Sequence, residues 1–204
     1  MSAPAVAGGR PIILASASPR RESLLRYRGY EFEVIPSEAP EEVGQSPTET
    51  VLENARRKAQ GVAKLRPDAV VVGVDTDVFF AGRVLGKPAD FDAAIRMLGE
   101  LNGRAHIVYS GVCIAWDGGA HERTFVDETR VQFHRRTEME MRAYLRRIQP
   151  LDKAGAYAAQ DDGGVMIAKV EGSLSNVMGL PMEKLEQELA ALAPQFGWRL
   201  PGQA

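Results

Sequence analysis

An apolar strand that leads directly into an arginine-bearing helix start is the feature that most restricts the fold of this sequence. The run Ile12–Leu14 is typical of a buried strand. Ser18-Pro19 then predicts a helix N-terminus, with serine as the N-cap and proline at the first helical position. Arg20 and Arg21 fall in the first turn, where the helix dipole and the exposed N–H groups favour an anion. The stretch predicts an α/β unit with a phosphate site, although a ridge of surface arginines fits the local residues equally well.

Length and composition indicate one domain. The 204 residues are 45% hydrophobic, which is ample for a core, and residues 1–10 have no signal-peptide apolar run. We predict a disordered lead-in at 1–10 and a single domain at 11–204. The net charge of −2 gives no bulk attraction to nucleic acid or membrane, and the lone cysteine, Cys113, excludes a disulfide framework. We expect a cytoplasmic protein with no nucleic-acid or membrane partner.

Strand-like and helix-like segments alternate along the chain. After the first strand, further strands are predicted at 32–35, 69–74, 105–116, 124–133 and 165–170, with a hairpin at 78–85. Helices are predicted at 19–28, 47–65, 91–101, 138–149 and 182–193, the second opened by a capping box from Ser46 to Glu49. This order predicts an α/β fold with a mixed, twisted sheet and flanking helices.

Three charged side chains are candidates for a ligand site. Asp75 follows directly after an apolar strand, and we favour a functional carboxylate over a turn cap because Asp77 adds a second acid without a turn signal. Glu41 lies in an acidic loop that is either solvated or a source of ligands for a divalent metal. Lys58 falls on or beside the apolar stripe of the helix 47–65, so it either snorkels or points into a cleft.

Two later segments also suit a ligand. Gly86-Lys87-Pro88 is not a Walker A loop, because proline replaces the Ser or Thr that would hold magnesium, so the lysine is interpreted as a positioned charge on a rigid corner. Segment 152–160 is expected to lie outside the core; it carries Lys153 and Gln160, whose amide can read a base edge. The histidines lack metal-ligand spacing and are expected at the surface or at strand ends: His106, His121 and His134.

Cations and acids together predict a polyphosphate site. The cations are Arg20, Arg21, Lys58 and Lys87, and the acids are Glu41, Asp75 and Asp77. Cations alone would indicate plain anion binding and acids alone a metal site, whereas both suit a polyphosphate with its divalent ion. The reaction class that follows is attack of water on phosphorus. Asp75 would take the proton or hold the metal, and the cations would stabilise the charge on the leaving phosphates.

Five sequence blocks, in order, resemble the Maf family of nucleoside triphosphate pyrophosphatases. They are Leu14–Leu25, Gly73-Val-Asp-Thr76, Leu85-Gly-Lys-Pro88, Asp152-Lys-Ala-Gly-Ala-Tyr157 with Gln160, and Gly179-Leu-Pro181. The resemblance implies a Maf/ITPase-like α/β fold with two lobes around a cleft. It implies hydrolysis of a nucleoside triphosphate between the α and β phosphates, with Mg²⁺ or Mn²⁺, to the monophosphate and pyrophosphate. It also implies a homodimer.

Residue by residue, the resemblance makes Asp75 the proton acceptor and places Glu41 near the metal, with Asp75 as a second ligand. The family's substrate-binding positions are matched by Ser16, Arg20, Arg21, Lys58, Thr76, Lys87, Lys153 and Gln160. Positions tied to base choice in the branch that acts on dTTP and UTP are matched by Arg20, Thr76 and Gln160. The branch that acts on 7-methyl-GTP is less similar, because it carries Asp-Gln where this chain has Asp75-Thr76.

Two departures from the family pattern leave rate and specificity open. Asp77 stands where the family usually has an apolar residue, and Ala158 stands where it usually has glycine. The expected function is house-cleaning hydrolysis of dTTP and UTP. One alternative is the same chemistry on modified or other nucleotides, such as 7-methyl-GTP. Another is a nucleotide-binding regulator without turnover, since the family name is linked to septum formation. It ranks last because the chain keeps Asp75, Lys58 and Lys87.

Overall fold

The computed structural model describes residues 9–201, which divide into two compact units. The first contains the described residues up to Asp75, Ser110–Asp127 and those from Gly179 onward; the second contains Thr76–Tyr109 and Glu128–Met178. The lead-in predicted at 1–10 lies almost wholly outside the described residues. None of the helices in the part of the chain described is long and apolar enough to cross a membrane.

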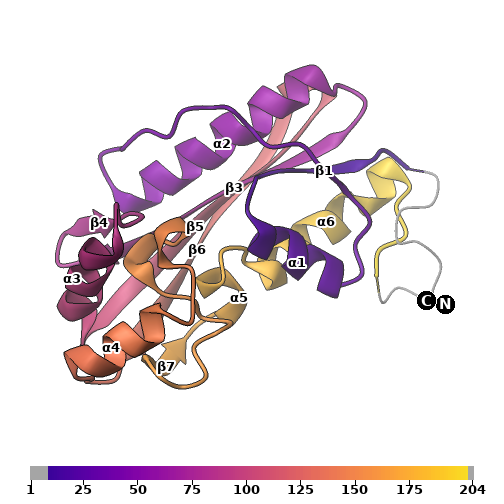
Figure 1. Ribbon diagram of the computed structural model, residues 1–204. Coiled ribbons are helices and arrows are strands. Elements are labelled where there is room, and N and C mark those ends of the chain that lie inside the picture. The colour runs from indigo at the N-terminus through magenta and orange to yellow at the C-terminus, as the bar shows by residue number, and fades with distance from the viewer. Residues whose placement is uncertain (1–8, 202–204) are drawn as a thin grey trace. The chain divides into compact units, whose positions relative to one another are not determined.

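Helices and strands alternate through residues 9–201 (Figure 1). The helices are α1 (Pro19–Tyr27), α2 (Pro47–Leu65), α3 (Phe91–Leu101), α4 (Glu138–Leu145), α5 (Leu174–Val177) and α6 (Met182–Phe196). The strands are β1 (Ile12–Ala15), β2 (Glu33–Val34), β3 (Val70–Phe80), β4 (Arg83–Leu85), β5 (Ala105–Trp116), β6 (His121–Phe133) and β7 (Ile167–Glu171). Short 3₁₀ turns lie at Asp117–Gly119, Pro150–Asp152 and Ala154–Ala156.

The strands form one mixed sheet in the order β2-β1-β3-β5-β6-β7, with β4 paired to β3. Strand β1 is parallel to both β2 and β3, whereas the β3–β4 and β6–β7 pairs are antiparallel. The mixed α/β fold with flanking helices predicted from the sequence is therefore confirmed.

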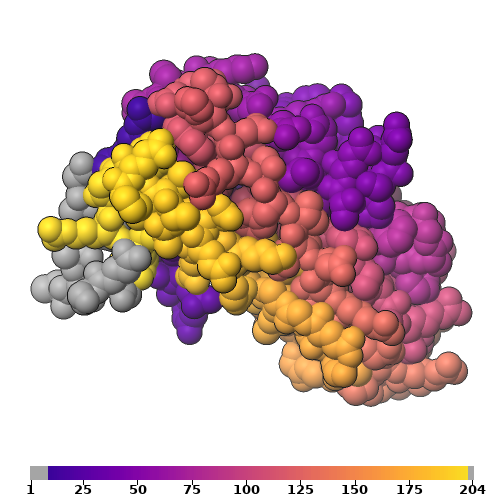
Figure 2. All heavy atoms as spheres, turned by 180° about the vertical axis from the view of Figure 1, so that it is seen from behind, coloured from indigo at the N-terminus to yellow at the C-terminus, as the bar shows by residue number. Residues whose placement is uncertain are grey.

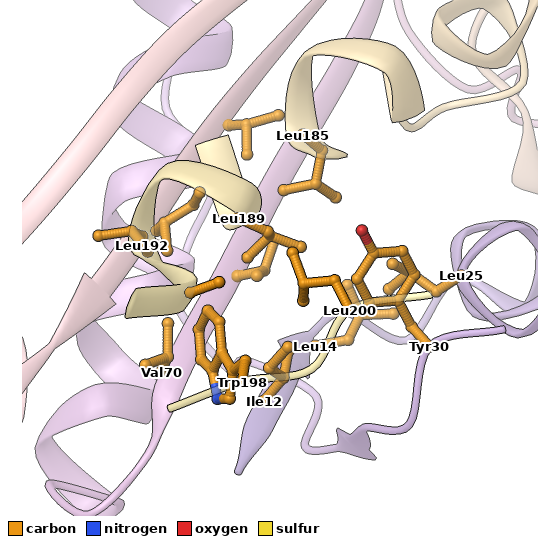
Figure 3. Close-up of a cluster of buried hydrophobic side chains, with 14 of the residues drawn as sticks. Ile12, Leu14, Leu25, Tyr30, Val70, Leu185, Leu189, Leu192, Trp198 and Leu200 are labelled. Atoms are coloured by element: carbon orange, nitrogen blue, oxygen red, sulfur yellow. The ribbon is translucent and has the colours of Figure 1, made fainter. Parts of the chain in front are cut away.

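In the first unit, alternate side chains of the strands pack against helices on opposite faces. Ile13, Val71 and Cys113 are buried with the alanines of α2. The alternate positions of the same strands are buried with α6, whose Leu185 and Leu189 lie among them (Figure 3). This alternation is what a central strand covered on both faces requires. The core role expected for Cys113 is confirmed, and burial raises the pKa of its thiol to about 12.

The backbone of α2 lies unusually close to the strands. A Cβ atom at Gly73 would come within 2.3 Å of the Ala55 carbonyl oxygen, and one at Gly111 would come within 2.3 Å of the Val51 carbonyl oxygen. Only glycine permits such an approach. The predicted span 47–65 of this helix is confirmed, and its predicted apolar stripe is buried: Val51, Ala55, Ala59, Val62 and Ala63.

Helix α6 closes the other face of the first unit. Leu185, Leu189 and Leu192 are buried, as predicted. On the outer surface, α6 is seen beside the segment 110–127 (Figure 2), where Lys184 binds the Asp127 carboxylate at 2.6 Å. The helix runs three residues beyond its predicted end, to a left-handed Gly197 at its C-terminus.

The second unit has its own core. Buried side chains of α3 and α4 pack with those of β5, β6 and the segment 154–157. The hairpin between β3 and β4 turns at Ala81-Gly82, both with positive φ, as predicted. Asp90 caps α3 by accepting the Ala93 N–H at 2.6 Å, and Thr137 and Glu140 form the predicted capping box of α4.

Several boundaries differ from the predictions. Asp75 does not follow a finished strand: it lies inside β3, because pairing with β4 extends that strand to Phe80. Helix α4 ends at Leu145, four residues early, and Pro150 opens a 3₁₀ turn soon after. The Ser46 hydroxyl accepts the Glu49 N–H, but the Glu49 carboxylate accepts from Gln45 and not from Ser46, so only half of that capping box forms.

The close approach at Gly73 generates a prediction. Gly73→Ala forces the backbone of α2 away from β3, and overpacking of this kind should lower the free energy of unfolding by about 3 kcal/mol. The matched control is Gly99→Ala in α3, where a new Cβ meets no atom within 4 Å; it should raise stability by about 0.5–1 kcal/mol. Urea unfolding of both variants gives the measurement, and equal effects would contradict the close packing.

Candidate functional site

A lysine ammonium lies between two carboxylates in the first unit. Lys58 Nζ, on α2, is 2.6 Å from Asp75 Oδ1 on β3 and 2.7 Å from Glu41 Oε1 in the loop before α2. The side chains of Lys58 and Asp75 are 12% and 9% exposed, whereas that of Glu41 is 57% exposed. The ammonium therefore faces two acids and does not snorkel into solvent, and its place in a substrate cleft stays a prediction.

Asn54 belongs to the same cluster and was not anticipated from the sequence. Its Nδ2 donates to Asp75 Oδ2 at 3.1 Å, so each oxygen of the Asp75 carboxylate has its own donor. The side chain is buried and one helical turn before Lys58. That i, i+4 spacing puts both polar groups on one face of α2 and was the signal available in the sequence. We call Asp75, Lys58, Glu41 and Asn54 the Asp75 cluster.

The structure also brings together residues predicted to bind phosphate around the start of α1. Ser18 is the N-cap, but its side chain makes no capping hydrogen bond; its N–H instead donates to Ser16 Oγ at 3.2 Å. Arg21 donates to the same hydroxyl at 3.0 Å and to the Gly179 carbonyl at 2.8 Å. These contacts fix one guanidinium beside the helix N-terminus, and Arg20 lies half-buried in the same turn. They also join two sequence blocks that are 158 residues apart.

Four of the predicted site residues belong to the second unit. Thr76 is half-buried in β3, and the Lys87 and Gln160 side chains are exposed. Lys153 is buried, and its ammonium donates at 2.6 Å to both the Gln149 carbonyl and the Asp152 carboxylate. The Lys153 ammonium is thus bound to its own neighbours along the chain. Its contact with substrate stays a prediction.

Segment 152–160 is partly core, contrary to the prediction. Ala156, Tyr157 and Ala158 are all less than 6% exposed, because small side chains let the segment pack closely. Tyr157 OH lies 2.9 Å from the ring nitrogen Nε2 of His106, and that histidine is buried at 2% exposure and not at a surface. The Ala158 N–H donates to Tyr144 OH at 2.9 Å. Ala158, which stands where the family usually has glycine, is therefore buried and its backbone is hydrogen-bonded within the core.

The donor set of the Asp75 cluster fits a divalent metal. Asp75 and Glu41 both lie within hydrogen-bond distance of one cation, so the same pair of oxygens suits Mg²⁺, which is commonly held by one or two carboxylates together with substrate phosphates and water. Among residues 9–201, no group of three or more His, Cys, Asp or Glu residues is placed to hold a metal. Phosphate oxygens would complete the coordination of a metal at these two acids.

Comparison with known proteins identifies the relatives of this chain. A family model described as "Maf-like protein" matches residues 11–192. A protein of Carboxydothermus hydrogenoformans named dTTP/UTP pyrophosphatase is 44% identical over 87% of this chain and 96% of its own length. One of the same name from Bacillus cereus (strain ZK / E33L) is 42% identical over 88% of this chain and 94% of its own. A solved structure, protein VC0702 from Vibrio cholerae, aligns with 91% of this chain and 95% of its own at 17% identity. The TM-score of 0.39 is too low to support a conclusion about this chain.

The buried His106 predicts a pH-dependent stability. Burial lowers the pKa of its imidazole from 6.5 to about 4, so between these values the unfolded chain binds a proton that the folded chain does not. The free energy of unfolding should have its full contribution from His106 above pH 6.5. It should fall as the pH drops toward 4, by about 3 kcal/mol for this group. Urea unfolding at pH 7 and pH 4.5 measures the loss.

Two variants separate burial from hydrogen bonding as the cause. His106→Gln should remove this part of the pH dependence. Tyr157→Phe removes the 2.9 Å contact but keeps the His106 ring buried. It should therefore lower the free energy of unfolding at every pH and leave its pH dependence unchanged. A slope that persists in His106→Gln would assign the effect to another group.

Proposed function

The chain belongs to the Maf family, and from that premise we propose that it hydrolyses dTTP and UTP to the monophosphate and pyrophosphate. The observation that carries the proposal is a buried carboxylate, Asp75, held by Lys58 and Asn54 in a chain 44% identical to a protein named dTTP/UTP pyrophosphatase. The assignment makes it a nucleoside triphosphate diphosphatase, a hydrolase that removes nucleotides in the cytoplasm. From the family resemblance we also propose that the protein forms a homodimer.

The first unit supplies the groups that the reaction needs. Water attacks phosphorus at the α–β bridge, the bridging P–O bond breaks, and pyrophosphate leaves. Asp75 accepts the proton of the water. Lys58 holds the Asp75 carboxylate in place and adds positive charge beside it. Arg21, braced by Ser16 and Gly179, and Arg20 stabilise the charge on the phosphates from the start of α1.

A divalent metal, Mg²⁺ or Mn²⁺, would be held by Glu41 and Asp75. When bound, it supplies a Lewis acid that neutralises phosphate charge. Lys58 interacts with both of these acids, so a bound metal would share the two carboxylates with the lysine ammonium.

The base and the remaining phosphate contacts are assigned to the second unit. We assign Thr76 and Gln160, with Arg20, to the choice of uracil or thymine, and Lys87 and Lys153 to substrate binding. The motif matches support these roles. The exposure of Lys87 and Gln160 is compatible with contact to a ligand.

A panel of triphosphates tests the reaction and the branch. The purified protein is incubated with Mg²⁺ and each triphosphate, including 7-methyl-GTP, and the products are identified. Monophosphate and pyrophosphate from UTP and dTTP support the proposal. The same products from 7-methyl-GTP alone would favour the sister branch. Orthophosphate and diphosphate would overturn the bond assignment, and binding without turnover would favour a regulator.

Asp75→Asn predicts loss of turnover with binding retained. The amide keeps the shape of the side chain but cannot accept the proton, so kcat should fall by at least about 100-fold. UTP affinity by calorimetry should stay within about threefold, because the cations of the first unit remain. The control is Asp92→Asn, the same chemical change at an exposed carboxylate in α3, which should leave kcat unchanged. Lost binding in a folded Asp75→Asn protein would point to a metal-holding role in place of proton transfer.

A further inference from the structure

We propose that Asn54 is a positioning residue, which fixes the Asp75 carboxylate and the acidic loop before α2 in one arrangement for catalysis. The proposal rests on the function proposed above. Asn54 is 3% exposed and lies on the face of α2 that packs on β3. None of the five sequence blocks that carry the family resemblance contains it.

The Asn54 amide makes three hydrogen bonds in two directions. Its Nδ2 donates to Asp75 Oδ2 at 3.1 Å and to the Glu42 carbonyl at 3.0 Å. Its Oδ1 accepts the Glu42 N–H at 2.9 Å. Both amide protons and the amide oxygen are thus used, so the orientation of the group is determined. The flipped amide would place its oxygen against a carboxylate and a carbonyl, and its NH₂ against an N–H.

The neighbouring contacts show why a neutral amide is suited to this position. Asp75 already receives the Lys58 ammonium on Oδ1, which supplies positive charge. Asn54 donates a directional hydrogen bond to the second oxygen, Oδ2, without adding a charge. With both oxygens held, rotation of the carboxylate is restricted, and a reacting group displaced by about 1 Å can lose two orders of magnitude in rate.

The same amide links Asp75 to the loop that carries Glu41. Glu42 follows Glu41 directly, and both its N–H and its carbonyl are bound to Asn54. Thr50, one turn earlier on α2, holds the loop separately: its Oγ1 accepts the Gly44 N–H and donates to the Ser46 carbonyl, both at 2.9 Å, and not to Asp75. Arg57 adds an ion pair to Glu42. The loop is therefore held by several side chains of α2. Two of them also touch Asp75: Lys58, which reaches the loop through the Glu41 side chain, and Asn54, which binds the loop backbone at Glu42.

Asn54→Leu and Thr50→Val separate the two roles. Leucine keeps the branched heavy-atom skeleton of Asn54, in a larger side chain, but removes its hydrogen bonds to both Asp75 and the loop, whereas Thr50→Val loosens the loop alone. We expect Asn54→Leu to lower kcat by about 10- to 100-fold with KM changed less than about threefold, and Thr50→Val to keep kcat within about twofold. Thermal unfolding checks that both variants are folded. Equal effects of the two, or an unchanged kcat in Asn54→Leu, would overturn the proposal.

A structural readout keeps this test separate from the proposed function. The kinetics use whichever triphosphate the wild-type protein turns over. Crystal structures of both variants are determined in parallel; the Asp75 carboxylate should rotate in Asn54→Leu and stay in place in Thr50→Val. An unmoved Asp75 in Asn54→Leu would reject Asn54 as a positioning residue whatever the substrate. Absence of turnover in the wild type, with Asp75 displaced in the variant, would reject the proposed function alone.

Discussion

The close contact between α2 and the strands beneath it determines where the charged groups of the first unit lie. Because Gly73 and Gly111 have no side chain, the backbone of α2 rests almost directly on β3 and β5. At that separation the short Asn54 side chain reaches Asp75, and the longer Lys58 reaches both Asp75 and Glu41. A bulkier residue at either glycine would separate the helix from the carboxylate that it holds. Packing, in this unit, sets the electrostatics.

The Asp75 cluster also follows a general rule for buried charge. A carboxylate that is 9% exposed is costly unless donors replace the water it has lost. Here an ammonium and an amide do so, one on each oxygen. Glu41 completes the charge balance from a side chain that remains largely in solvent. The oxygens of this buried carboxylate thus have partners within the protein in place of water.

Contacts far apart in the sequence recur throughout the candidate site. The Arg21–Gly179 bond ties the first helix to the start of α6, and Tyr157 reaches His106 across 51 positions. Through the His106 contact, the segment that carries Lys153 and Gln160 is anchored in the core of the second unit. Short sequence blocks are thus stabilised by partners outside them, which explains why a motif match alone does not show how a side chain is held.

The sequence by itself determined the order of the main helices and strands, most of their boundaries and the candidate residues of the site. Periodicity and caps act over a few residues, so α2, the first turn of α1 and the hairpin at Ala81-Gly82 could be predicted from local chemistry. Only the tertiary structure decided that β3 continues past Asp75, that the small residues around Tyr157 are core, and that Asn54 holds the acid. The reason is physical: burial and hydrogen-bond partners depend on which distant segments pack together, and a side chain's local sequence carries little record of them.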